Sequence, residues 1–576
     1  MQCKHSTLIR SLLNTAMVAA VLMLAVGAMA ITPDVTKQRS VTFVGAPKTA
    51  SIKDTFTVTA TDNSDTETAT ITATGSCSVP TGSTGGTVTV TMTKSTGSCA
   101  VKASWAADAT YAAATATQTT TAYLGYNESV IWNFGQNGWP DGIAPAGNGL
   151  VFDAAGNLYA TVIDDGGTLN GDGAVVEFSL KDGVWTETVL YVFNRLSTGF
   201  TGYHPVGTLA MDSKGNLYGV TTNGGTGGCT SSGVPPSWVG CGAVYELSPP
   251  TEAGGVWTAK GLYSFQGSGS QSSSGTGTDG FWPFSGVTLA SASATTLYGT
   301  TTCGGTGMLN DEGDTCGDSS GGGLNANGAG TVYELTYSKT TAKWSETVLY
   351  SFSGNGASNG GADGWYPESG LLLKSGNLYG TTCHGGPPNH EAGTVYELKP
   401  GVPWTETVLH SFNGTDGACP MYGTPVMDTE SNLYGTTNEG GTVPTAAGTA
   451  WELKYDAGTY NPTATVLYSF GSQATDGTNP SWGLVSYKGS WYGTTGGWQS
   501  GQFGATYGTA FKLTYSAATG WQEKTLWTFN GQSDTDIGSP GWNQLVVDKD
   551  GNFYGMAPIG PDGVAQGGGV FELSPK

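Results

Sequence analysis

The stretch NLYGTTCHGGPPNHEAGTVYELKPGVPWTETVLHSF, residues 377–412, decides the fold of this chain. It contains three short runs rich in β-branched and aromatic residues: NLYGTT at 377, GTVYEL at 393 and TVLHSF at 407. Segments rich in glycine and proline separate the runs, which is typical of strands joined by turns. The stretch therefore predicts consecutive β-strands rather than helices.

Versions of these phrases recur seven times along the chain. Phrases of the TVLYSF type begin at residues 129, 188, 260, 347, 407, 465 and 524. Phrases of the LYGTT type begin, with one preceding residue, at 157, 216, 296, 377, 432, 490 and 552. A DGxxP turn and a short apolar strand complete each repeat, and four-stranded repeats are typical of β-propeller blades. We therefore predict an all-β protein in which residues 126–576 form a seven-bladed β-propeller.

The two ends of the repeat region favour a closed ring. The region opens at 129 with a strand of the TVLYSF type and ends with GVFELSP at 569–575. The last repeat thus lacks the one strand that the first segment supplies. We expect the N-terminal strand to complete the C-terminal blade, whereas an open solenoid would need capping repeats.

The phrases LYGTTxxGG, GTVYEL and ETVLYSF recur within residues 129–574. The region resembles the Gloeo/Verruco (GloVer) repeat family of exported bacterial proteins. This resemblance implies export and a repeated fold, and it implies no established activity.

Residues 33–122 are predicted to form a separate β-domain. The runs TFTVTA at 55–60 and TVTVTM at 87–92 alternate with period two, as half-buried strands do. Through SVTF at 40, GSCSV at 75 and GSCAVKASWAAD at 97, the segment resembles bacterial Ig-like repeat domains. The resemblance implies an immunoglobulin-like β-sandwich that acts as a spacer.

Residues 1–30 have the features of a secretory signal peptide. Lys4 and Arg10 precede an apolar run over 16–26, and Ala28-Met29-Ala30 offers a small-residue cleavage site. A membrane anchor is the alternative, but the run is short for a span. We expect a secreted or cell-envelope protein with no transmembrane anchor after signal removal.

The charge of the chain argues against a nucleic-acid partner. The signal carries two cations and no acidic residue, so its loss changes the net charge from −22 to −24 (−22 − 2). Polyanions bind weakly to so acidic a surface.

The cysteine count favours disulfides. Nine cysteines become eight when Cys3 leaves with the signal, and an even number in an exported chain indicates pairing. One pair follows from the twice-used phrase GSCxV, two lie within single connections between second and third strands, and one joins neighbouring blades. The expected bonds are Cys77–Cys99, Cys229–Cys241, Cys303–Cys316 and Cys383–Cys419.

Aromatic residues gather in the connections that vary most from repeat to repeat. Exposed rings there could stack on sugars or grip a peptide, although rings within the repeated turn could instead wedge between blades. Trp238 and Trp498 lie outside the repeated phrases and are the stronger candidates. The predicted ligand-binding residues are Trp238, Trp498, Trp282, Trp365 and Tyr366.

We predict no metal site, no other cofactor and no catalytic residue. The aspartates of the DGxxP turns could ring a channel as metal ligands, but such residues more often accept hydrogen bonds from turn amides. Calcium stays an open alternative because Asp548 and Asp550 share one turn. His384 and His390 share a loop with Glu391, although their spacing matches no metal-binding motif.

The function predicted from these features is binding rather than catalysis. The protein would present the variable end of the propeller to an extracellular glycan or protein. Two alternatives remain: a polysaccharide-active enzyme, which would need two carboxylates roughly 5 to 9.5 Å apart, and a purely structural envelope component.

Overall fold

A computed structural model of the chain provides the structure. It describes residues 37–63, 68–94, 96–123, 125–134, 149–163, 172–195, 202–227, 229, 240–252, 254–267, 279–307, 328–354, 361–387, 392–443, 447–473, 476–480, 482–496, 498–499, 502–503, 507–530, 538, 540, 544–558 and 568–576. The chain forms two compact units, residues 1–124 and 125–576. Within the described part, no helical segment has the length and hydropathy of a membrane span.

The first unit consists of two four-stranded sheets that share one core. Their orders are β1-β3-β6-β5 and β2-β8-β7-β4. Alternate residues of each strand point inward, so Val58, Val90 and Val101 are fully buried. A disulfide between Cys77 and Cys99 joins the two sheets. The strands are β1 (Val41–Val44), β2 (Thr49–Ser51), β3 (Thr55–Asp62), β4 (Thr70–Gly75), β5 (Cys77–Ser78), β6 (Thr87–Met92), β7 (Ser98–Trp105) and β8 (Ala114–Tyr123).

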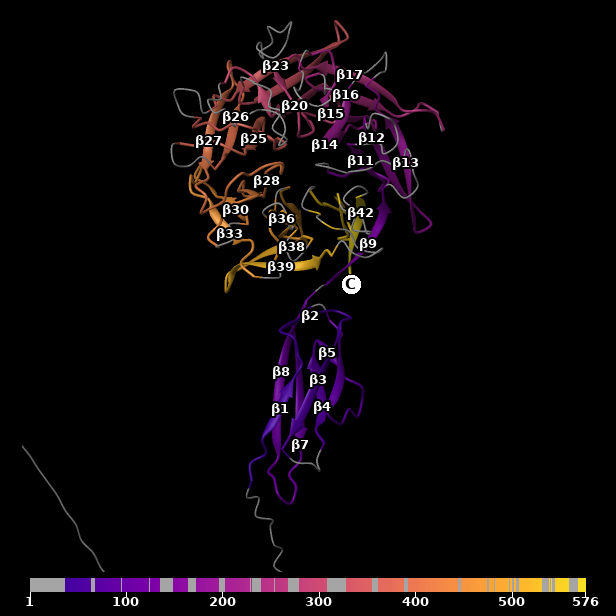
Figure 1. Cartoon of the computed structure of the whole chain (residues 1–576), viewed down its shortest axis with the longest axis vertical. Coiled ribbons are helices and arrows are strands. Elements are labelled where there is room, and N and C mark those ends of the chain that lie inside the picture. The colour runs from indigo at the N-terminus through magenta and orange to yellow at the C-terminus, as the bar shows by residue number, and fades with distance from the viewer. Residues whose placement is uncertain are drawn as a thin grey trace, which may run out of the picture. The chain divides into compact units, whose positions relative to one another are not determined.

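The second unit contains seven four-stranded antiparallel sheets among its described residues. Figure 1 shows them arranged in a ring, with the fourth strands on the outside. Sheet 1 is β10 (Val151–Phe152), β11 (Leu158–Val162), β12 (Ala174–Lys181) and β13 (Val184–Val192), and sheet 2 is β14 (Tyr203–Met211), β15 (Leu217–Asn223), β16 (Ala243–Ser248) and β17 (Thr258–Ser264). Sheet 3 is β19 (Thr288–Leu289), β20 (Thr296–Thr301), β22 (Thr331–Ser338) and β23 (Lys343–Ser351), and sheet 4 is β24 (Leu372–Lys374), β25 (Asn377–Thr382), β26 (Thr394–Lys399) and β27 (Thr405–Ser411).

The remaining sheets follow the same order. Sheet 5 is β28 (Val426–Met427), β29 (Leu433–Thr437), β30 (Thr449–Leu453) and β33 (Thr465–Ser469), and sheet 6 is β34 (Val485–Tyr487), β35 (Ser490–Thr494), β38 (Thr509–Ser516) and β39 (Gly520–Thr528). Sheet 7 is β40 (Val546–Val547), β41 (Phe553–Ala557), β42 (Gly569–Pro575) and β9 (Tyr126–Asn133). Strand β9 pairs with β42 from Asn133 opposite Gly569 to Tyr126 opposite Pro575. The expected closure by the N-terminal strand is therefore confirmed.

Phenylalanines at the ends of the fourth strands join each sheet to the next. Phe352 of sheet 3, for example, meets Tyr396 of sheet 4 edge to face, with ring centroids 5.2 Å apart. Phe134, which follows β9, lies 5.9 Å from Phe178 of sheet 1 and so closes the series. Equivalent pairs are Phe193–Tyr245, Phe265–Tyr333, Phe412–Trp451, Phe470–Phe511 and Phe529–Phe571. The F of TVLYSF is thus the residue that packs neighbouring sheets together.

The glycine of the LYGTT phrase is required by the same packing. A Cβ atom on Gly380 would overlap the hydroxyl of Tyr396, and one on Gly493 would lie 2.6 Å from Cζ of Phe511. The third-strand ring therefore lies directly on the backbone of the second strand. Only glycine permits so close an approach.

The two ends of the sheets differ in their connections. The DGxxP turns pair with the start of the second-to-third connections, as in β18 (Gly280–Phe281) with β21 (Cys303–Gly304) and in the bridge between Trp365 and His384. We call this the loop end. The opposite, hairpin end has tight turns in which an aspartate caps the backbone. Asp548, for example, accepts from the amide of Asn552 at 2.9 Å, as Asp153, Asp212 and Asp428 do in their own turns.

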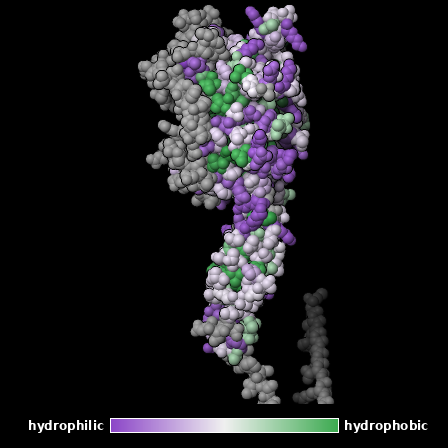
Figure 2. Space-filling model, turned by 90° about the vertical axis from the view of Figure 1, so that its right-hand side faces the viewer, coloured by the Kyte–Doolittle hydropathy of each residue, from purple (hydrophilic) through white to green (hydrophobic). Residues whose placement is uncertain are grey.

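Figure 2 shows one side of the molecule, on which hydrophilic residues and residues of intermediate hydropathy surround small hydrophobic patches. Large hydrophobic side chains that are exposed in the described part are Val44, Leu180, Val184, Val256, Val402, Tyr455 and Tyr515.

Candidate functional site

Backbone hydrogen bonds of the DGxxP turns connect a sheet to the preceding one. In five turns the residue before the proline has a left-handed φ of 50° to 60°. In Tyr366 the amide donates to the Ala329 carbonyl of the previous sheet at 3.0 Å, and the carbonyl accepts from Cys383 at 3.1 Å. These two bonds hold a backbone conformation that non-glycine residues rarely adopt. The residues at this position are His204, Trp282, Tyr366, Cys419 and Asn479.

The aspartates of these turns serve the scaffold. Asp279 accepts from the hydroxyl of Tyr263 at 2.7 Å and from the amide of Gln266 at 3.0 Å. Asp363 accepts in the same way from Tyr350 and Ser353, at 2.8 and 2.9 Å. The turn interpretation thus describes both carboxylates. In the described residues no group of three His, Cys, Asp or Glu side chains could hold a metal ion.

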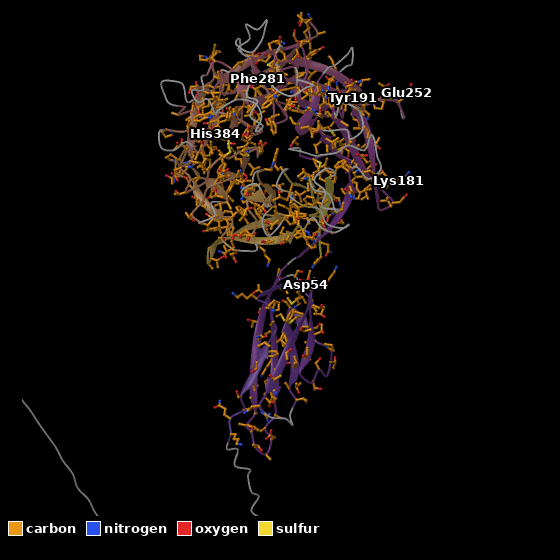
Figure 3. The ribbon with its side chains drawn as sticks, in the orientation of Figure 1. Asp54, Lys181, Tyr191, Glu252, Phe281 and His384 are labelled. Carbon is orange, nitrogen blue, oxygen red and sulfur yellow. A yellow bond between two sulfur atoms is a disulfide. The ribbon has the colours of Figure 1, made fainter. Side chains whose placement is uncertain are left out.

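Three of the five predicted ligand-binding residues have described side chains. Trp365 is 4% exposed and stacks on His384, with centroids 5.8 Å apart and planes 18° apart. Tyr366 meets the same imidazole edge to face at 5.6 Å. Trp282 is partly buried against the core between sheets 2 and 3. Figure 3 labels His384 and the fully buried Phe281.

The structure describes less of the other candidate residues. The side chains of Trp238 and Trp498 lie outside the described residues, as do His390 and Glu391. The backbone of Trp498 belongs to β36 (Trp498–Gln499), which pairs with β37 (Gln502–Phe503). The structure therefore brings His384 against Trp365 and Tyr366, in a packed arrangement that leaves little of the Trp365 ring for a ligand.

Disulfides brace the loop end. Cys229 is bonded to Cys241, and Cys383 of sheet 4 is bonded to Cys419 at the entrance to sheet 5. Cys303 is also disulfide-bonded, and its expected partner Cys316 lies outside the described residues.

A second group of side chains follows the prolines, where the chain enters each first strand. The ring of Tyr422 stacks on that of Trp482, with centroids 4.7 Å and planes 15° apart. Phe284 lies 5.3 Å from Tyr422 on a plane inclined by 32°. These residues lead into sheets 5, 6 and 3, and sheets 3 and 5 are not neighbours in the ring. The three rings therefore meet toward its centre.

Glu368 enters sheet 4, between the sheets of Phe284 and Tyr422. Burial raises its pKa to about 7. Its charge, together with burial, raises the pKa of Tyr422. Glu368 is thus near enough to influence the stacked rings and keeps its proton under mildly acidic conditions. We call Phe284, Glu368, Tyr422 and Trp482 the ring-mouth cluster.

Other carboxyl groups with raised pKa values belong to the repeat. Burial, with a smaller effect of Asp279, raises the pKa of Glu346 to about 7, and burial with Asp363 raises that of Glu406 to about 8. Both glutamates are the E of ETVLYSF and occur in successive sheets. Their recurrence in successive sheets indicates that these carboxyl groups are part of the repeated scaffold.

Sequence reasoning singled out the aromatic turns but missed Phe284, Glu368 and Tyr422. The signal was present in the pair of residues after the proline, because no two repeats have the same pair whereas most keep the DGxxP turn. Their convergence could not be inferred, since it depends on the diameter of the ring.

Residues 306–558 match the model of the Gloeobacter/Verrucomicrobia repeat. This segment runs from the second-to-third connection of sheet 3 to the end of β41 in sheet 7. No curated protein matches the sequence.

Several solved structures are similar to the chain. A quinonprotein alcohol dehydrogenase-like protein from Bacteroides thetaiotaomicron has a TM-score of 0.30 and 11% identity, covering 86% of this chain and 94% of that chain. An α-L-arabinofuranosidase from Clostridium thermocellum has 0.27 and 15%, covering 55% and 91%. An exo-1,5-α-L-arabinanase from a bovine ruminal metagenomic library has 0.25 and 9%, covering 67% and 98%.

Proposed function

We propose that the protein is an exported or cell-surface binding protein with a seven-bladed β-propeller and an Ig-like spacer. In this proposal residues 1–30 are a signal peptide, 33–122 are the spacer and 126–576 are the propeller. Seven similar sheets joined through one series of phenylalanine contacts support the propeller. Disulfides in both units support an oxidising, extracellular location.

The ligand proposed for the loop end is an extracellular glycan, bound at the ring-mouth cluster. The observation that carries this proposal is the stack of Phe284, Tyr422 and Trp482, which come from three sheets. Phe284 and Tyr422 stay partly exposed, so ring faces remain for a sugar to cover. A protonated Glu368 would donate a hydrogen bond to a sugar oxygen beside them.

The surroundings of Glu368 in the described part of the chain agree better with binding than with hydrolysis. A raised pKa suits a general acid, but glycoside hydrolysis uses a second carboxylate within about 10 Å. Burial raises the pKa of Glu368, and among the described residues no other carboxylate contributes to that rise. The carboxylates that do lie close together, such as Asp279 and Glu346, belong to the repeated scaffold.

A glycan array tests the proposal. The chain without residues 1–30 would be applied with and without calcium, beside the variants Phe284→Ala, Trp238→Ala and Trp498→Ala. Tyr515→Ala is the matched control, because Tyr515 is an exposed aromatic residue at the hairpin end. We expect glycan binding that Phe284→Ala weakens and Tyr515→Ala keeps. Binding that disappears only in the Trp238 or Trp498 variant would place the glycan site at that tryptophan and not at the ring-mouth cluster. Absence of binding in every condition would contradict the proposal that the ligand is a glycan.

A further inference from the structure

A hollow of about 300 Å³ opens at the hairpin end, on the opposite side of the ring from the ring-mouth cluster. It lies between sheet 4 and an extra hairpin of sheet 5, formed by β31 (Tyr455–Asp456) and β32 (Thr459–Tyr460). Among the described residues, only sheet 5 has such a hairpin between its third and fourth strands. We call this hollow the hairpin groove. It is a place where one repeat departs from all the others.

The extra hairpin is held firmly over the groove. The Tyr455 amide donates to Oδ1 of Asn432 at 2.9 Å, and the Tyr460 hydroxyl donates to the Ser431 carbonyl at 3.0 Å. The ring of Tyr460 also meets Tyr379 of sheet 4 edge to face at 6.2 Å. The two walls of the groove are thus positioned before any ligand arrives, which lowers the entropic cost of binding.

The floor of the groove is a fixed polar network. Oε1 of Glu397 accepts from Nδ2 of Asn377 at 2.7 Å and from the hydroxyl of Tyr379 at 2.9 Å. Its other oxygen lies 3.1 Å from Nζ of Lys399. Glu397 is 5% exposed, so its charge is already matched by protein donors. It does not need a cation from the ligand.

The rim supplies the groups that a ligand would meet. Tyr455 lines the groove, is 39% exposed and packs edge to face with Tyr460. Lys374 and Lys399 both line the groove, against the single carboxylate of Glu397. Lys374 forms no ion pair with any described residue, so the residues that line the groove carry one positive charge in excess. On a chain with a net charge of −22, this concentration of lysines is local and specific.

We propose that the hairpin groove binds a short saccharide that carries a carboxylate, such as a uronic acid oligosaccharide. The Tyr455 ring would cover a sugar face, the hydroxyl-bearing lining would exchange hydrogen bonds with sugar hydroxyls, and Lys374 would face the carboxylate. The volume lies at the lower end for ligand pockets, which suits a short segment. This inference does not rest on the function proposed for the ring mouth.

Calorimetry on the chain without residues 1–30 tests the inference. The probes are a galacturonic acid trisaccharide and the galactose trisaccharide of the same linkage. We expect the acidic probe to bind and the neutral one to bind at least about tenfold more weakly, with an affinity for the acidic probe that falls as salt rises. Tyr455→Ala should weaken binding about tenfold, and Lys374→Gln should weaken it several-fold and reduce the salt dependence.

The control variants separate the two sites. Tyr515→Ala removes an exposed tyrosine at the same end of sheet 6, and Phe284→Ala alters the ring mouth; both should leave binding of the acidic probe unchanged. Tyr455 and Lys374 are exposed, so their variants should unfold at the wild-type temperature. Equal binding of both probes would overturn the anionic ligand. Unchanged affinity in Tyr455→Ala, or no binding of either probe, would overturn the site.

Discussion

The Nε2 atom of His410 lies 3.1 Å from Oδ2 of Asp416, where other repeats place a tyrosine hydroxyl against the same aspartate. The Nδ1 atom lies 2.7 Å from the carbonyl oxygen of Pro462, so this nitrogen carries a proton. The imidazole thus lies between Asp416 and the backbone of Pro462, in a side chain that is 5% exposed.

Replacing His410 by phenylalanine should destabilise the protein by about 1–3 kcal/mol at pH 7, because the Asp416 carboxylate loses its contact with the imidazole. Burial alone would raise the pKa of Asp416, but His410 and the Asn413 amide outweigh it and hold the pKa below 3.8. Their contribution is complete above pH 3.8 and disappears as the pH falls through the folded-state pKa. Urea unfolding at pH 7, 5 and 3 should show the difference shrinking in acid.

His410→Tyr is the matched control for that measurement. It restores the residue that the fourth strands of sheets 2, 3 and 5 use against their aspartates, so it should recover much of the stability lost in His410→Phe. A difference between wild type and His410→Phe that is the same at all three pH values would contradict a role for the ion pair.

Glu368 should make stability depend on pH in the opposite sense. Its pKa rises from 4.5 to about 7 on folding because the carboxyl group is buried. The folded state holds this proton between those values, so stability falls as pH rises through that window, by up to about 3 kcal/mol. Glu368→Gln should remove this fall, and thermal unfolding at pH 5 and 8 measures it. Glu252→Gln, at an exposed position, should leave the pH dependence unchanged.

The bond between Cys383 and Cys419 should stabilise the ring more than the bond between Cys229 and Cys241. The first closes 36 residues and joins two sheets, whereas the second closes 12 residues. Loop-closure entropy gives about 4 and about 3 kcal/mol respectively. Serine double variants of each pair, unfolded in denaturant, should therefore differ by about 1 kcal/mol. A larger loss in the Cys229–Cys241 variant would show that local packing outweighs chain entropy.

Much of the fold could be predicted because it repeats. The phenylalanine of TVLYSF, the glycine of LYGTT and the strand at 129 each have one physical role, so seven copies of a weak pattern become a strong one. The bonds Cys229–Cys241 and Cys383–Cys419 followed from the same register. Sheet 4 depends on the same register, because His410 of β27 stands where the TVLYSF phrase has tyrosine.

The sites could be predicted less well because they depend on distances across the ring. Phe284 and Tyr422 are far apart in sequence and enter non-adjacent sheets, so only the curvature of the ring brings them together. Trp365 looked like an exposed aromatic residue in a loop, yet His384 covers it. The hairpin groove depends on six residues, 455–460, whose sequence differs little from an ordinary turn.

One substitution in the turn of the extra hairpin should raise the stability of the protein. Ala457 has a φ of 50° and Gly458 one of 92°, as in the two-residue turns that favour Asn-Gly. Ala457→Asn should stabilise the protein by about 0.5–1 kcal/mol, because asparagine tolerates the left-handed conformation better than alanine. Asp182→Asn is the control: Asp182 has a φ of 53° before Gly183 and already suits its turn. A lower unfolding temperature for Ala457→Asn than for wild type would rule out this account.

The junction between sheets 7 and 1 should be as strong as any other in the ring. Phe134 is 2% exposed and meets Phe178, and Phe352 is fully buried and meets Tyr396 in the middle of the chain. Phe134→Ala and Phe352→Ala should each cost about 3–5 kcal/mol, since each leaves a cavity between two sheets. Denaturant unfolding of both variants makes the comparison. If β9 were only loosely attached, Phe134→Ala would cost much less than Phe352→Ala; a similar cost means that the last sheet is held by its borrowed strand as firmly as the others are by their own.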